Sequence, residues 1–146
     1  MDSRSRRLSR VVRRWLESAE EDRTAVRALS ALGTPRALGF HAQQAVEKLI
    51  KAVLISYDVQ PEETHAVGVL LGQLHRLDRS LVDSLGPVDR LTPYAVRLRY
   101  PPSAGAHDRQ VSDGTAAADA ALASEACEKL DAAISARLRV LEGDAA

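Results

Sequence analysis

Apolar residues recur at intervals of three and four along most of this 146-residue chain, and this spacing restricts its fold more than any other feature. Because an α-helix turns about 100° per residue, such residues share one face, which packs against other helices. The first segment predicts an amphipathic helix from about Ser5 to the turn Gly33-Thr34-Pro35, where Gly suits a helix end and Pro a helix start. Its apolar positions are Leu8, Val11, Val12, Trp15, Leu16, Ala19, Val26 and Leu29.

Two further long helices follow from the same spacing, from about Arg36 to Tyr57 and from about Asp113 to Leu141. Shorter helices are expected after a cap at Thr64, around residues 80–84 and around residues 91–98. No stretch alternates with period two, so strands are not expected. The sequence therefore predicts an all-α, up-and-down antiparallel bundle of four main helices plus short helices.

We expect this bundle to form one domain over residues 1–146, with flexible ends at 1–7 and 142–146. The lone Cys127 excludes an internal disulfide framework and a multi-cysteine zinc site. No apolar run approaches the ~20 residues that a membrane span needs. We therefore expect a cytoplasmic protein that has no metal, no cofactor and no membrane contact.

The charge balance limits how the chain could bind a polyanion. Twenty basic and twenty acidic residues give a formal net charge of zero, so such a site must be local. Residues 1–14 concentrate positive charge, either as a solvated helix end or as a phosphate-contacting arm. The arginines concerned are Arg4, Arg6, Arg7, Arg10, Arg13 and Arg14.

The second predicted helix carries a polar strip formed by His41, Gln44, Lys48 and Lys51, which fall within an arc of about 80°. Such donors could hold a phosphate or a carboxylate. Alternatively, the strip is an ordinary exposed face on which Glu47 pairs with Lys51 at i,i+4.

Several segments together resemble the HEPN family, the higher eukaryotes and prokaryotes nucleotide-binding domains. The most specific is Gln-Gln-Ala-x-Glu-Lys-x-x-Lys-Ala at 43–52, preceded by Trp15-Leu-Glu-Ser-Ala-Glu-Glu-Asp22 and followed by Thr64-His65 and Arg97-Leu-Arg-Tyr-Pro101. The resemblance covers roughly residues 8–142. It implies a helical bundle that dimerises about a two-fold axis and acts with a minimal nucleotidyltransferase, in some cases as a toxin–antitoxin pair.

Active HEPN members are metal-independent ribonucleases that use an Arg and a His separated by four to six residues. Here Arg99 and His107 are separated by seven, and two prolines intervene at 101–102. The matching pair Arg36 and His41 lies elsewhere, on side chains about 140° apart. The resemblance therefore favours a chain without intact nuclease catalysis, although Arg99 and His107 remain the candidate catalytic pair.

Arg97, Arg99 and Tyr100 could bind phosphate and stack a base. Alternatively, Tyr100 only ends a helix while Arg99 pairs with an acid of the first helix, such as Asp22.

Three functional hypotheses result from these observations. The first is a homodimeric module that binds nucleotide or RNA phosphate in a cleft lined by Lys48, Lys51, Arg97, Arg99 and Tyr100. The second is a ribonuclease toxin that uses Arg99 and His107. The third is a dimerisation scaffold whose charged strips contact only protein.

Overall fold

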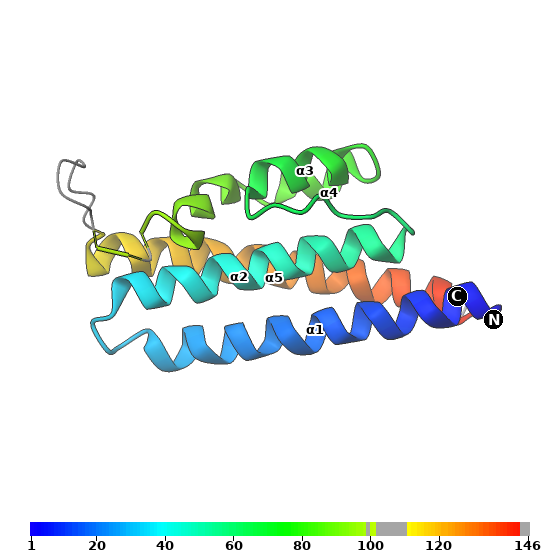
Figure 1. Cartoon of the computed structure of the whole chain (residues 1–146), viewed down its shortest axis with the longest axis horizontal. Helices are drawn as coiled ribbons and strands as arrows, with labels where there is room; N and C mark the ends of the chain where they lie inside the picture. The colour runs from blue at the N-terminus through cyan, green and yellow to red at the C-terminus, as the bar shows by residue number, and fades with distance from the viewer. Residues whose placement is uncertain (99, 102–110, 144–146) are drawn as a thin grey trace.

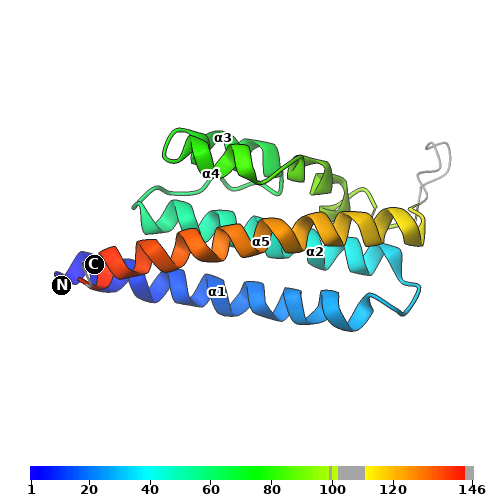
Figure 2. The ribbon, with the colours of Figure 1, turned by 180° about the vertical axis from the view of Figure 1, so that it is seen from behind.

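In the part of the chain that the structure describes, three long helices lie side by side, and three shorter ones run along one side of them (Figures 1 and 2). A computed structural model describes residues 1–98, 100–101 and 111–143, and every regular element in these residues is helical, which confirms the predicted fold class. The long helices are α1 (Ser3–Leu29), α2 (Pro35–Ser56) and α5 (Asp113–Glu142). The short ones are α3 (Val67–His75), α4 (Arg79–Ser84) and the 3₁₀ helix η1 (Val88–Ala95).

The directions of the long helices differ in one respect from a purely up-and-down bundle. A short turn makes α1 and α2 antiparallel, as predicted, but α5 runs parallel to α2 (Figure 1). The guanidinium of Arg137, near the end of α5, accordingly donates to the carbonyl of Ser56 at the end of α2, over 3.0 Å. The reason is the long connection after α2, which carries the chain back to the end of the bundle where α2 begins.

The turn between α1 and α2 has the chemistry expected from the sequence. Gly33 adopts φ +66, in the left-handed region where a side chain would be strained. Pro35 follows as the first residue of α2, where its missing N–H is not needed. Helix α1 begins at Ser3, capped by the Asp2 carboxylate, which accepts from the Ser5 amide over 2.8 Å, so residues 3–7 are helical in the structure.

Helix α2 is the centre of the core and packs against both other long helices. Its residues Leu49 and Ile50 are almost fully buried, as are Leu130 and Ile134 of α5. Each such side chain contributes about 1.5–3 kcal/mol through its removal from water. In the first halves of both helices the buried side chains that face the partner helices are small, namely Ala42, Ala45, Ala120 and Ala123.

The helix expected around residues 91–98 is where the prediction was least accurate. The structure shows a 3₁₀ helix over Val88–Ala95, with Pro93 inside it. Because proline has no N–H and clashes with the preceding turn, residues 88–95 cannot form an undisturbed α-helix. The predicted helix after Thr64 likewise begins only at Val67.

Candidate functional site

A buried carboxylate, that of Glu47, organises one part of the polar side of α2. Glu47 is 3% exposed and accepts from Lys51 Nζ over 3.2 Å and from Gln43 Nε2 over 3.0 Å. Nδ1 of His65, in the connection before α3, lies 2.9 Å from the same carboxylate. Glu47 thus ties the 57–66 connection to α2.

A second buried carboxylate, Asp22 of α1, links α1 to α2. Its Oδ2 lies 2.6 Å from Lys48 Nζ and its Oδ1 lies 2.8 Å from Nδ1 of His41. Asp22 is 6% exposed, so both contacts form largely away from water. Removing one member of such a pair leaves an uncompensated charge, which makes the interaction sensitive to substitution.

The structure therefore places the predicted strip of His41, Gln44, Lys48 and Lys51 within these contacts. Gln44 donates to the Gln43 side chain over 2.7 Å, and each lysine meets a carboxylate. The expected i,i+4 pair between Glu47 and Lys51 is confirmed. Two ammonium groups face two carboxylates, so little net charge is left for an anion. Assignment of the strip to phosphate binding stays a prediction, and the contacts favour a structural role.

Sequence reasoning named Glu47 only as a partner of Lys51 and Asp22 only as a partner for Arg99, and it assigned no contact to Gln43. The position of Asp22 in the sequence could have indicated its burial. It lies three residues after Ala19 and four before Val26, at the spacing of buried positions. The ring of His65 contacts Glu47, while the His65 carbonyl accepts from Gln43 over 3.3 Å.

A separate polar cluster anchors η1 against α5 and α2. The Tyr94 hydroxyl donates to Asp119 over 2.6 Å, and Arg90 Nε donates to the other oxygen of Asp119 over 2.8 Å. Burial of Tyr94, together with its hydrogen bond to Asp119, raises the pKa of the phenol. The ring lies against Gly39 of α2, where a Cβ would come within 2.0 Å of Tyr94 Cε1. These contacts hold η1 in place, and with it the point at which the segment 96–101 begins.

Arg97 and Tyr100 follow this anchored helix and are both exposed, Tyr100 by 60%. Gly39, which receives Tyr94, and Lys48 are nine residues apart on α2, which places them about 180° apart around the helix. Lys48 faces α1 through Asp22, whereas η1 contacts the opposite side of α2. The structure thus does not bring Lys48 next to η1. Arg99 and His107 lie outside the described residues.

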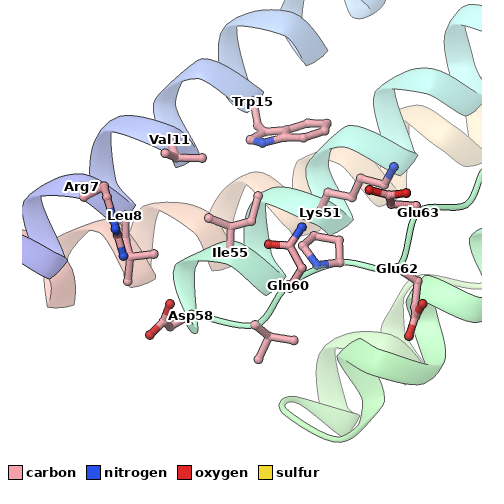
Figure 3. Close-up of a pocket in the computed structure, with 12 residues that line it drawn as sticks. Arg7, Leu8, Val11, Trp15, Lys51, Ile55, Asp58, Gln60, Glu62 and Glu63 are labelled. Atoms are coloured by element: carbon pink, nitrogen blue, oxygen red, sulfur yellow. The ribbon is translucent and has the colours of Figure 1, made fainter.

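The structure also shows a groove of about 530 Å³ between α1, the end of α2 and the 58–63 connection (Figure 3). Its apolar lining consists of Leu8, Val11, Trp15, Ile55, Val59 and Pro61. Arg7 lies on the α1 side, and Glu62 and Glu63 lie on the opposite side. Lys51 Nζ lies 5.7 Å from the centre of the Trp15 ring, a cation–π contact. Trp15 packs against the core and also lines this groove.

The fold and the motif residues agree with the comparison to known families. The chain matches the HEPN domain over residues 12–133 and belongs to this family. No curated protein and no solved structure matches it. None of the helices in residues 1–98, 100–101 and 111–143 is long and apolar enough to cross a membrane.

Proposed function

We propose that this HEPN-domain protein is a module that binds nucleotide or RNA phosphate and acts with a minimal nucleotidyltransferase-like partner. The observation that supports it is the pair Arg97 and Tyr100, exposed on a segment that Tyr94 and Asp119 anchor. An arginine attracts phosphate, and an exposed aromatic ring offers a face on which a base stacks. Arg97 has no ion-pair partner among the residues that the structure describes.

The proposed module differs from the cleft expected from sequence in the residues that it uses. Lys48 and Lys51 are neutralised by Asp22 and Glu47, and the Lys48–Asp22 pair joins α1 to α2. Ligand binding is assigned to the segment after η1, which includes Arg99. The long spacing between Arg99 and His107 leads us to propose binding without intact nuclease catalysis. We further propose that the protein forms a homodimer and that it acts with the partner protein as a toxin–antitoxin pair.

The test is isothermal titration calorimetry, in which the full chain is titrated with mononucleotides and with a short single-stranded RNA. The Arg97→Ala, Tyr100→Ala variant should bind the RNA about tenfold more weakly, since it loses one phosphate contact and one stacking contact. The control is Arg76→Ala, Leu32→Ala, which removes an exposed cation and an exposed large side chain elsewhere. Equal affinity of the two variants would refute the assignment to this segment.

A further inference from the structure

Helix α1 carries a stripe of three exposed arginines, Arg7, Arg10 and Arg14, which we call the arginine stripe. None of the three has a hydrogen-bond or ion-pair partner within the described part of the chain. Their spacing of three and four residues places them within an arc of about 60° on one face. Two other arginines of this end are neutralised, Arg4 by Asp58 and Arg13 by Glu142. The stripe is therefore uncompensated charge on a protein of zero net charge.

The arginine stripe borders the groove described above. Arg7 belongs to both, and the groove residues Leu8, Val11 and Trp15 lie on the adjoining face of α1, within about 100° of Arg7. Figure 3 shows the Trp15 ring at the groove with Arg7 on the same helix. The side chain of Trp15 is half-buried, so part of the ring is accessible.

Charge around the groove is polarised across its width. The α1 side is positive at Arg7. The opposite side carries three acids, Asp58, Glu62 and Glu63, and one cation, Lys51, which is paired with Glu47. A phosphate backbone would therefore be held to the α1 side and repelled from the other. Carboxylates on the far side are suited to accept hydrogen bonds from ribose hydroxyls or from base amino groups. The stripe is limited toward the C-terminus by Glu17, which follows Arg14 by one turn.

From these observations we infer that the arginine stripe and the Trp15 groove form a second binding surface, for single-stranded nucleic acid. The three arginines bind phosphates of the strand, and one unstacked base enters the groove against Trp15. This combination of a cationic track with an aromatic platform suits single strands of varied sequence. The surface lies at the end of the bundle that holds both chain termini, away from η1 (Figure 1). It does not depend on the proposed role of Arg97 and Tyr100.

An acidic amphipathic peptide is the competing occupant, because it too would meet the arginines while placing apolar side chains in the groove. We favour the nucleic acid because three adjacent cations match a regularly charged strand and the groove contains an aromatic ring. The two occupants differ in how binding depends on Trp15, so the experiment includes both.

The experiment measures fluorescence anisotropy of labelled oligouridylate of about 12 nucleotides, a length within the usual site size, at several salt concentrations. Arg7→Gln, Arg10→Gln, Arg14→Gln is compared with Arg27→Gln, Arg76→Gln, Arg79→Gln, which removes the same charge from other exposed positions. The stripe variant should lose about tenfold in affinity. Its slope of log affinity against log salt should fall by about 2, because each lost phosphate contact contributes about 0.7.

A second variant tests the groove. Trp15→Leu keeps an apolar side chain but removes the stacking surface, so binding should weaken several-fold while the salt slope stays unchanged. Circular dichroism establishes that each variant is folded. A matching deoxyuridine oligomer distinguishes the sources of the ligand: weaker DNA binding shows that ribose hydroxyls contribute, and equal binding shows that phosphate and base suffice.

Two results would overturn the inference. The first is an equal loss of affinity in the stripe variant and its charge-matched control. The second is labelled oligoglutamate binding as tightly as the RNA, together with RNA binding that Trp15→Leu leaves unchanged, which would make this a docking surface for acidic protein. The Arg97→Ala, Tyr100→Ala variant leaves this surface intact, so the failure of one proposal is distinguishable from failure of the other.

Discussion

The carboxylate of Asp22 lies 2.6 Å from the ammonium group of Lys48, and the contact joins α1 to α2 across the interior of the bundle. His41 shares the same carboxylate. The pair shows that the α2 segment on which the HEPN resemblance is densest builds internal contacts. The motif residues of this segment are therefore direct evidence for the fold and only indirect evidence for a ligand.

Substituting Asp22 should destabilise the protein strongly. Asp22→Ala leaves the partly buried Lys48 without its carboxylate, and we expect a loss of about 3 kcal/mol in the free energy of unfolding, as for broken buried pairs. Urea denaturation followed by circular dichroism measures this loss. The control is Glu20→Ala, which removes an exposed partner of Arg27 and should cost less than about 1 kcal/mol. Equal losses would contradict the structural role of Asp22.

Gly39 should not tolerate a methyl group. The Cβ of Gly39→Ala would lie 2.0 Å from Tyr94 Cε1, so the ring must move and the Tyr94–Asp119 hydrogen bond must be disturbed. We expect a destabilisation of about 1–3 kcal/mol. Gly72→Ala is the matched control, because it is also helical and meets nothing within 4 Å. That substitution should stabilise α3 by about 0.5–1 kcal/mol, and both changes can be read from thermal unfolding.

Acidification should loosen the end of the bundle where α1 begins and α5 ends. The hydroxyl of Ser9 and the guanidinium of Arg13 both donate to Glu142 and hold the pKa of its carboxyl below the ordinary value of 4.5. A group with a lowered pKa stabilises the fold above its ordinary value, and this contribution is lost as the pH falls through the lowered one. The difference in the free energy of unfolding between pH 7 and pH 3 should therefore be smaller in Glu142→Gln than in the wild type. An unchanged pH dependence would exclude this carboxylate as a contributor.

Cys127 should be unreactive in the folded protein. It is 1% exposed, and burial raises the pKa of its thiol to about 12, so very little thiolate exists near neutral pH. Iodoacetamide should label the chain slowly under native conditions and rapidly in denaturing urea, as mass spectrometry would show. Rapid labelling without urea would indicate that α5 opens readily from the bundle.

The helical elements could be predicted from sequence wherever a long apolar face coincided with a clear terminal signal. The last helix shows this well, since Ser112 caps it and its observed range, Asp113–Glu142, differs by one residue from the expected end. The region around Pro93 was harder, because the apolar spacing of Leu91 and Tyr94 fits an α-helix while the proline does not permit one. The apolar spacing alone does not show which of the two signals determines the local structure.

The candidate site was less accessible to sequence reasoning than the fold. An angular argument placed Lys48 and Lys51 on one strip of α2 and gave Glu47 as a partner of Lys51, but it could not show that Asp22 of α1 neutralises Lys48. Asp22 and Lys48 are 26 residues apart in the chain, and only the pairing of α1 with α2 brings them together. Periodicity places side chains around one helix; it does not identify what the neighbouring helix contributes.

The same-direction course of α2 and α5 has a practical consequence for engineering. The first turns of α1 lie against the last turns of α5, joined through Arg13 and Glu142, while the 30–33 turn is at the far end of the bundle. A circularly permuted chain that is opened at this turn and closed by a linker between the neighbouring helix ends would keep the same helix packing. Such a rearrangement would convert the connection between α1 and α2 into a pair of ends suitable for attaching reporters.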